Sequence, residues 1–291
     1  MQQVTIVGLG LIGASLGLAL KQLKNPPRVV GHDLQYDAAT RASKLKAVDK
    51  VERYLPDAVV GSDLVIVATP VGAIPDLFAR MAESLSEGCV VTDTGSTKRE
   101  ILLKAQELLP SRVAFVGGHP MTGRQTSGVD APKASLFQNS VYCLVPSPTA
   151  PTDAVDTMVK LVQQIGASAY FVDAAEHDGL VAGVSHLPYL LSTALVRSLA
   201  AGPGWREMSA VAAGGFEIAT RLAGHDPKMF ADILATNGDN VVMQLDRLVE
   251  QLECFRNELV AERPDLFKEL EQGQKHRLEW EAQRRRAAEK L

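Results

Sequence analysis

Short apolar runs rich in valine and isoleucine alternate, in the first part of the chain, with amphipathic segments of helical period. Buried parallel strands joined by crossover helices produce this alternation. The pattern predicts strands at 3–8, 28–33, 64–69, 89–93, 113–117, 141–145 and 169–172. It predicts helices at 11–23, 37–45, 72–84, 97–108 and 153–165. We therefore expect a parallel sheet covered by helices, with 146–151 as a surface loop.

The strand pattern stops near residue 174, and only helices are predicted beyond it. Asp226-Pro227 offers an N-cap followed by proline at the first helical position. The helices are expected at 175–201, at 205–223 with a break at Gly214-Gly215, from 226 to about 260 with an interruption at Asn237-Gly238, and from Pro264 onward. The chain is thus expected to divide into a sheet domain, 1–174, and an all-helical domain, 175–291.

Charge and cysteine usage narrow the class of protein. The 291 residues carry a net charge of -4, which argues against a nucleic-acid binder. The three cysteines lie far apart, which favours a reduced, cytoplasmic compartment over a disulfide scaffold or a metal site. The apolar start has no basic leader, and no run is expected to reach the eighteen or so apolar residues of a membrane helix.

A glycine-rich turn follows the first strand and opens the first helix. Gly8, Gly10 and Gly13 have the G-x-G-x-x-G spacing, and the backbone of Leu11 and Ile12 lies between the last two glycines. In this context Gly8 permits the tight turn, Gly10 lets a pyrophosphate approach, and Gly13 lets the helix pack on the strand. The sequence therefore predicts a Rossmann-type dinucleotide-binding domain.

Two further positions belong to the predicted cofactor site. Asp33 ends the second strand, at the spacing of a carboxylate that binds a ribose 2′-hydroxyl. Because such a carboxylate would repel a 2′-phosphate, we expect NAD rather than NADP. Thr69-Pro70 ends the third long strand, which would place a helix start beside the cofactor.

Two later strand ends carry groups that could do chemistry. His119 lies in the run Gly117-Gly118-His119-Pro120, which we expect to be a glycine-rich loop after a strand. A histidine titrates near neutral pH and could take the proton of an alcohol, but it could equally just end a strand. Ser96 could orient His119 or touch the nicotinamide, or it could simply cap the helix that follows.

The helical part adds a second set of candidates. His186, Pro188 and Tyr189 lie inside an apolar helix, where a proline costs about 3 kcal/mol unless the helix compensates. Arg221 lies in a small apolar stretch and could pair within the fold or bind a substrate carboxylate. We expect His177-Asp178 to cap the first long helix rather than to take part in catalysis.

The order of these motifs resembles the prephenate/arogenate dehydrogenase family of tyrosine biosynthesis. The resemblance spans nearly the whole chain: GLGLIGASLGLAL at the start, TP at 69–70, DTGSTK at 93–98, GGHPMTG at 117–123, HD at 177–178, SHLP at 185–188 and ATRLA at 219–223. The GGHPM and SHLP motifs are not general features of dinucleotide-binding folds. The series as a whole is therefore specific.

The resemblance implies an NAD-dependent oxidative decarboxylation of a cyclohexadienol. It implies that His119 is the base on the ring hydroxyl, that Ser96 orients His119, that Arg221 holds a substrate carboxylate, and that His186 lines the substrate pocket. Removal of the hydroxyl proton helps hydride to leave the same carbon, and loss of carbon dioxide then makes the ring aromatic. The protein must therefore supply a base, a carboxylate clamp and a well-placed nicotinamide.

Three departures from the family pattern bear on the substrate side chain. Tyr189 stands where many relatives have histidine, Arg124-Gln125 where Thr-Glu is frequent, and Ile218 where an acid is frequent. Arogenate carries an ammonium where prephenate carries a keto group, so an acidic partner would favour arogenate. Because Gln125 and Ile218 are not acids, the sequence favours prephenate, with arogenate or dual use as the alternative.

The helical part bears on the oligomeric state and on two competing functions. The helical half is too thin for a rich core of its own, so we expect it to form a homodimer and to contribute to the substrate site. Hydroxyacid and imine reductases share this plan but rely on a lysine in the helical half, and 175–223 contains none. A non-catalytic NAD sensor would have no reason to combine His119, Ser96 and Arg221.

Overall fold

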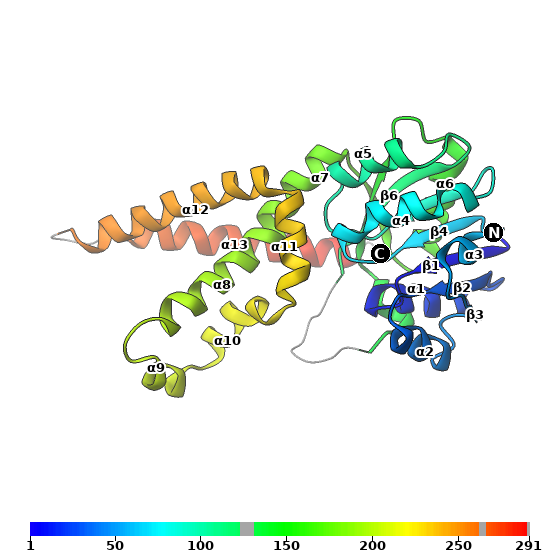
Figure 1. The fold of residues 1–291 in the computed structure, drawn as a ribbon. Coiled ribbons are helices and arrows are strands. Elements are labelled where there is room, and N and C mark those ends of the chain that lie inside the picture. The colour runs from blue at the N-terminus through cyan, green and yellow to red at the C-terminus, as the bar shows by residue number, and fades with distance from the viewer. Residues whose placement is uncertain (123–130, 262–265, 290–291) are drawn as a thin grey trace. The chain divides into compact units, whose positions relative to one another are not determined.

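A computed structural model describes residues 1–122, 131–261 and 266–289 of the protein (Figure 1). The chain forms two compact units, Met1–Asn237 and Gly238–Leu291. The boundary predicted at 174/175 marks where the strands end, since the last strand closes at Phe171. As a division into domains it stays a prediction.

An eight-stranded sheet is the centre of the first unit, in the order β3-β2-β1-β4-β5-β6-β7-β8. Its strands are β1 (Gln3–Val7), β2 (Arg28–His32), β3 (Lys50–Val51), β4 (Leu64–Val67), β5 (Val90–Asp93), β6 (Ala114–Pro120), β7 (Val141–Pro146) and β8 (Ser168–Phe171). Neighbours are parallel except β6 and β7, which are antiparallel. The predicted α/β fold class, a sheet domain followed by helices, is confirmed.

Helices cover both faces of this sheet. They are α1 (Leu11–Lys21), α2 (Tyr36–Lys44), α3 (Leu55–Val59), α4 (Ile74–Met81), α5 (Arg99–Leu108) and α6 (Thr152–Gln164), with short turns η1 (Val71–Ala73), η2 (Ala82–Ser84) and η3 (Ala134–Phe137). Side chains of α1, α2 and α6 share one buried apolar cluster, and those of α3, α4 and α5 share another. Burying a leucine or isoleucine side chain stabilises the fold by about 1.5–3 kcal/mol, so these two layers hold the sheet.

Two features of the sheet differ from the sequence prediction. β6 was expected to end at Gly117 and run parallel to its successor, yet it continues to Pro120 and pairs antiparallel with β7. Among the described residues the connection between them holds only η3, so no crossover helix returns the chain. The short elements β3 and α3 were missed because two and five residues are too few to display a period.

Among the described residues, only helices follow β8, as predicted. In the first unit they are α7 (Ala174–Val181), the π-helical turn η4 (Ala182–His186), α8 (Leu187–Ala200), α9 (Trp205–Val211), α10 (Gly214–Thr220), η5 (Arg221–Gly224) and α11 (Pro227–Thr236). Asp226 caps α11 by accepting a bond from Lys228 N, which confirms the predicted cap. The expected break at Gly214-Gly215 falls two residues earlier, and the glycines instead begin α10.

The second unit consists of α12 (Gly238–Leu259) and α13 (Phe267–Glu289). The predicted interruption at Asn237-Gly238 is confirmed, because α11 ends at Thr236 and α12 begins at Gly238. The predicted start of the last helix at Pro264 falls outside the described residues.

The expectation that no segment suits a membrane helix is wrong by length and composition. The continuous helical segment Ala174–Ala200 has 27 residues and a mean hydropathy of 1.4 in its most apolar window. Its buried polar residues His177, Asp178 and His186 bond other elements of the first unit, as described below. That window is 28% buried, so these polar contacts attach the segment to the first unit without enclosing it as a core helix.

Candidate active site

The glycine turn between β1 and α1 has the geometry of a dinucleotide cradle. Gly8 has a φ of +95°, and a Cβ atom there would lie 2.5 Å from Ala68 O. A Cβ atom at Gly13 would lie 1.9 Å from Gly8 O, so the helix can approach the strand only with glycine there. No atom of the described residues lies within 4 Å of a Cβ atom at Gly10, and no described side chain caps α1 at this position. The first backbone amides of α1 are therefore available to an anion.

Asp33 lies beside this turn, at the end of β2. Its two carboxylate oxygens accept hydrogen bonds from Leu9 N and Gln35 N, both at 2.7 Å. The carboxylate is half-buried and keeps further lone pairs on both oxygens. Asp33 thus stabilises the turn and can also accept a bond from a ribose hydroxyl.

A cleft of about 580 Å³ opens at the carboxyl ends of β1, β4, β5 and β6. This volume suits a small-molecule site, and the carboxyl edge is where ligands bind in open α/β sheets. Residues from the glycine turn, from strand ends and from the helices after β8 line it: Gly10, Leu11, Ile12, Thr69, Pro70, Thr94, Gly95, Ser96, His119, Ser185, His225, Asp226, Met229, Phe230 and Ile233 are among them. The cleft therefore brings together the predicted catalytic residues and part of the predicted cofactor set, namely Gly10, Leu11, Ile12, Thr69 and Pro70.

The first unit fits a dinucleotide on grounds of its own geometry. The uncapped start of α1 and the open space at Gly10 suit a pyrophosphate. The hydroxyl of Thr69 is buried at the cleft and has no hydrogen-bond partner among the described residues. An unsatisfied buried hydroxyl is costly, so a ligand group would stabilise it.

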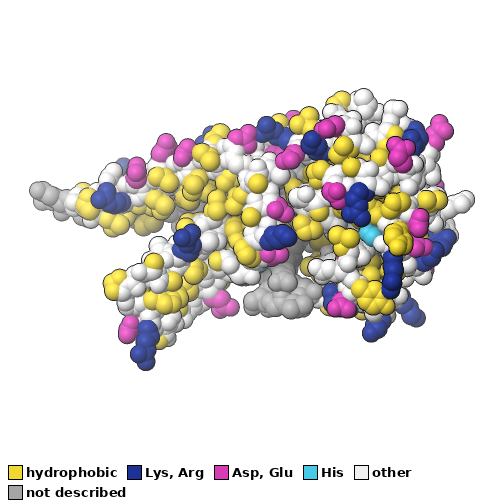
Figure 2. All heavy atoms as spheres, viewed as in Figure 1, with side chains coloured by type: hydrophobic (Ala, Val, Ile, Leu, Met, Phe, Trp, Pro, Cys, Tyr) yellow, Lys and Arg dark blue, Asp and Glu magenta, His cyan; other side chains and the backbone are white. Residues whose placement is uncertain are grey.

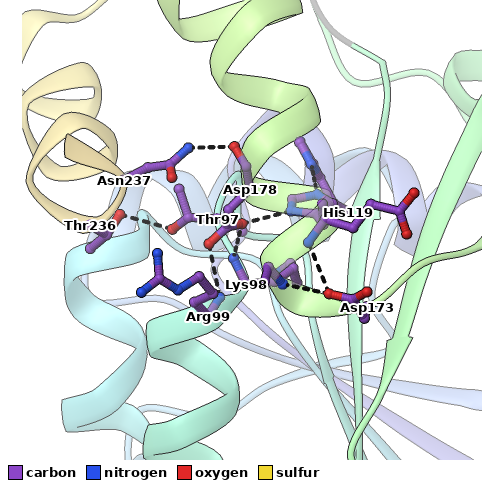
Figure 3. A network of polar contacts seen from close by, with 12 residues as sticks. Thr97, Lys98, Arg99, His119, Asp173, Asp178, Thr236 and Asn237 are labelled. Atoms are coloured by element: carbon purple, nitrogen blue, oxygen red, sulfur yellow. Dashed lines mark hydrogen bonds and ion pairs between the residues drawn. The ribbon is translucent and has the colours of Figure 1, made fainter. Parts of the chain in front are cut away.

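His119 ends a chain of hydrogen bonds that runs from the cleft to a buried carboxylate. His119 Nδ1 lies 2.9 Å from His177 Nε2, and His177 Nδ1 lies 2.8 Å from Asp178 Oδ1 (Figure 3). Asp178 is acceptor-only when ionised, so His177 Nδ1 carries the proton that it donates. His177 Nε2 then accepts from His119 Nδ1–H. The remaining nitrogen, His119 Nε2, holds the free lone pair of a base.

Asp178 is itself fixed from several sides. Its carboxylate accepts bonds from Lys98 N at 2.7 Å and Arg99 N at 3.0 Å, and so caps the start of α5 from a distant helix. Its carbonyl oxygen accepts a bond from Asn237 Nδ2 at 2.8 Å. In Figure 3 Asp178 lies between Asn237 and His119.

The surroundings of His119 keep its ring neutral. Burial lowers the pKa of His119 well below the usual 6.5, and the nearby His177, Lys98 and His186 lower it further. A base must be unprotonated to act. The site therefore holds His119 in the state that can accept a proton at neutral pH.

Ser96 lies in the same cleft as His119, but it does not orient it in this structure. No hydrogen bond joins the two side chains among the described residues, and His177 occupies Nδ1 of His119. Ser96 is not the cap of α5 either, because Lys98 stands at that position and Asp178 supplies the cap. A role of Ser96 toward the nicotinamide stays a prediction.

His186 and Tyr189 are buried behind the cleft instead of lining it. His186 has no exposed surface, and its Nδ1 accepts a bond from Asn237 Nδ2 at 3.2 Å. Its Nε2–H has no partner among the described residues. Tyr189 stacks on Phe230 at 3.6 Å between ring centroids, and Phe230 lines the cleft. Ser185, beside His186, is the residue of the SHLP motif that reaches the cleft.

Arg221 begins η5 as an exposed residue and does not line the cleft. His225 and Asp226, which come directly after η5, do line the cleft. Arg124 and Gln125 lie outside the described residues. No lysine or arginine lines the cleft in the part of the chain that the structure describes.

The expectation that His177-Asp178 caps its own helix is wrong. Asp173 caps α7, since its carboxylate accepts bonds from Ala175 N and Glu176 N, both at 2.9 Å. His177 is 1% exposed and Asp178 is fully buried, and both serve the contacts of His119. Two adjacent ionisable side chains in an otherwise apolar segment indicate a functional pair. The local sequence does not, however, identify the distant residue that they contact.

Comparison with known families gives two matches along the chain. A family model described as "Prephenate dehydrogenase, nucleotide-binding domain" matches residues 16–171, and one described as "Prephenate dehydrogenase, dimerization domain" matches residues 173–272. Together they cover strands β2 to β8 and the helical part as far as residue 272, in α13.

Individual proteins agree with these matches. The prephenate dehydrogenase of Bacillus subtilis is 35% identical over 87% of this chain and 69% of its own length. The cyclohexadienyl dehydrogenase of Zymomonas mobilis is 31% identical over 95% of both chains. The crystal structure of prephenate dehydrogenase from Aquifex aeolicus with hydroxyphenyl propionate and NAD+ superposes with a TM-score of 0.88, at 27% identity, covering 96% of this chain and 98% of that one.

Proposed function

This chain belongs to the prephenate dehydrogenase family, and we propose that it is a cytoplasmic enzyme that converts prephenate to 4-hydroxyphenylpyruvate with NAD. The observation that carries this proposal is His119, whose free nitrogen belongs to a cleft shared with the glycine turn. The complex of the Aquifex aeolicus relative with NAD+ and a hydroxyphenyl compound supports the same pairing of ligands.

His119 Nε2 takes the proton of the ring hydroxyl. The C–H hydrogen on that carbon leaves with its electron pair, and the C–C bond to the ring carboxylate breaks. Carbon dioxide departs, its bonding electrons enter the ring, and the former alcohol oxygen becomes a phenolate, which regains the proton from His119 Nε2–H to give the phenol. NAD, when bound, supplies the acceptor for the hydride.

His177 and Asp178 hold His119 in the correct tautomer and offset its positive charge. His119 gains a proton on Nε2 and keeps Nδ1–H directed at His177. His177 in turn donates to the Asp178 carboxylate, so negative charge lies behind the new imidazolium. This is the logic of a histidine–aspartate pair with one imidazole inserted.

Binding groups are proposed from the cleft and from the resemblance. The first amides of α1, Asp33 and Thr69 would hold the dinucleotide, with no acid–base role. Arg221 would hold a substrate carboxylate, because the described cleft lining carries no cation and η5 leads directly into it. Ser96 would contact the nicotinamide.

Arogenate is a second candidate substrate because of one acidic side chain. Asp226 lines the cleft and also caps α11. Its Oδ1 accepts a bond from Lys228 N at 2.9 Å, which leaves Oδ2 for a ligand. A carboxylate there could pair with the ammonium of arogenate.

Reduction of NAD by prephenate and by arogenate, followed by absorbance with product analysis, tests the proposal. We expect turnover with prephenate and formation of 4-hydroxyphenylpyruvate and carbon dioxide. Asp226→Asn keeps the helix cap, since asparagine caps as well as aspartate, but removes the charge. If the enzyme uses arogenate, this variant raises the KM for arogenate and leaves the KM for prephenate unchanged. Absence of NAD reduction with both substrates would refute the function.

The second unit supports the further proposal of a homodimer. Val242, Met243, Leu245, Val249 and Leu252 on α12 are exposed apolar side chains, and Figure 2 shows hydrophobic side chains gathered along this helix. Exposed apolar surface of this kind marks an interface. The match of residues 173–272 to a dimerization domain agrees. Light scattering should give twice the monomer mass; a monomer at micromolar concentration would contradict the proposal.

A further inference from the structure

We propose that Lys98 is a positioning residue for His119: its backbone amide and its buried ammonium each brace, through a different carboxylate, the group that carries the base. The inference rests on the proposed role of His119. Lys98 does not line the cleft, so it acts through its neighbours.

The backbone of Lys98 braces the side chain of His119. Lys98 N donates to Asp178 Oδ1 at 2.7 Å, the same oxygen that accepts the proton of His177 Nδ1 at 2.8 Å. His177 Nε2 then accepts from His119 Nδ1–H. The position of Lys98 therefore fixes the acceptor at the end of the hydrogen-bond chain (Figure 3).

The side chain of Lys98 braces the strand beneath His119. Lys98 Nζ forms an ion pair with Asp93 Oδ2. Asp93 Oδ1 accepts a bond from Gly118 N at 3.1 Å, and Asp93 Oδ2 accepts one from Gly95 N at 2.8 Å. Gly118 directly precedes His119 and Gly95 directly precedes Ser96, so this ion pair links both cleft segments.

The glycines before His119 make room for this arrangement. A Cβ atom at Gly117 would lie 3.2 Å from Lys98 Cδ and 3.1 Å from Val145 O. A Cβ atom at Gly118 would lie 2.6 Å from Asp93 O. The DTGSTK and GGHP motifs are thus complementary in shape, since one supplies the ion pair and the other the space for it.

A contribution to the free energy of unfolding does not by itself explain the ion pair between Lys98 and Asp93. Lys98 is 1% exposed and Asp93 is fully buried, so both ions have lost their water. Desolvation of a buried pair often cancels its attraction, and apolar residues of similar volume can be as stable. A buried pair that reaches both the strand and the hydrogen-bond chain of His119 has a positioning role instead.

The positive charge of Lys98 also acts on His119, in agreement with a positioning role. The buried ammonium contributes to the lowered pKa of His119, after burial and the nearby His177. The titratable groups that act on His119 or Lys98 come from four elements: His177 and Asp178 on α7, His186 on η4, Cys143 on β7 and Asp93 on β5. Burial lowers the pKa of Lys98 and the ion pair with Asp93 opposes that shift, while the charged ammonium lowers the pKa of His119. Its removal should therefore let His119 bind a proton more readily.

Lys98→Met, which keeps the length of the side chain without the charge, tests the inference. We expect kcat to fall by about tenfold or more with KM nearly unchanged, and the acid limb of kcat/KM to move to higher pH. The double variant Asp93→Asn/Lys98→Met leaves no unpaired buried carboxylate, and we expect the same direction of both changes. Lys21→Met is the matched control, because Lys21 pairs with Asp49 on the surface at 2.7 Å.

Each outcome bears on the inference. A folded Lys98→Met or double variant with the wild-type kcat and acid limb would overturn it, as would loss of folding in both, which would assign Lys98 to stability. His119→Asn in the same assay separates the two proposals. If that variant is fully active, the proposed function fails; if it is inactive while the Lys98 variants match the wild type, only the inference about Lys98 fails.

Discussion

His119 derives its chemistry from three groups that lie far from it in the sequence. His177, 58 positions away, accepts a hydrogen bond from His119 Nδ1–H, and Asp178 and Lys98 complete the arrangement. The histidine itself was predictable from its residue type and its place near a strand end. Its partners were not, because local patterns describe helix caps and periods but contain no information on contacts between distant elements.

Replacement of His177 tests the hydrogen-bond chain. His177→Phe fills the buried volume but removes the acceptor for His119 Nδ1–H, so His119 loses its fixed tautomer. We expect kcat to fall by about 10²-fold with little change in KM, measured by NAD reduction. The dissociation constant for NAD serves as the control. An unchanged kcat in a folded variant would show that His177 is only a packing residue.

The pH dependence of the wild type tests the electrostatics of His119. Its lowered pKa means that the ring stays unprotonated as pH falls through 6.5. The acid limb of kcat/KM should therefore lie below pH 6.5, with activity lost only as pH approaches the lowered value. A limb at or above 6.5 would mean that the ring is more hydrated, or nearer to negative charge, than the structure indicates.

At the scale of elements, the glycine turn was predicted fully and the helix after β8 only in outline. Gly8, Gly10 and Gly13 lie where strand, turn and helix were expected, because their roles depend on local backbone geometry. The π-helical turn η4 was missed. It precedes Pro188 in the first turn of α8, where proline needs no intrahelical N–H bond, and this relieves the expected cost of a helix proline.

The cradle can be tested without disturbing the fold. An alanine at Gly10 meets no atom of the described residues within 4 Å, so Gly10→Ala should fold normally, yet its methyl group would face the pyrophosphate. We expect weaker NAD binding, by about tenfold or more, with an unchanged melting temperature. Gly273→Ala on α13, which also has open space, is the matched control and should bind NAD normally. Equal NAD affinity in both variants would rule out this pyrophosphate site.

At the scale of the whole molecule, the sequence predicts that a sheet part precedes a helical part, but it does not predict where the first compact unit ends. The strands end near residue 174 as expected, but the compact unit continues to Asn237. Helices after β8 contribute Tyr189, Phe230 and Ile233 to the same apolar cluster as α4 and α5. Such packing depends on contacts between distant segments, which composition and periodicity do not encode.

Global stability should depend on pH through His186. Burial lowers its pKa to about 4, against the value of about 6.5 expected in the unfolded chain. The unfolded state therefore binds more protons below 6.5, and this part of the stability is lost as pH falls toward 4. Between pH 7 and 5 the wild type should lose on the order of 2 kcal/mol more unfolding free energy than His186→Gln. Equal losses by denaturant titration would contradict the assignment.

The most direct test of the account is the turnover of prephenate by the wild type and by His119→Asn. The wild type should reduce NAD and release carbon dioxide. His119→Asn should lose about 10²–10⁴-fold in kcat, because no base takes the hydroxyl proton, while its affinity for NAD stays unchanged. A wild type that does not oxidise prephenate, or a His119→Asn variant that does so at the wild-type rate, would contradict the central claim.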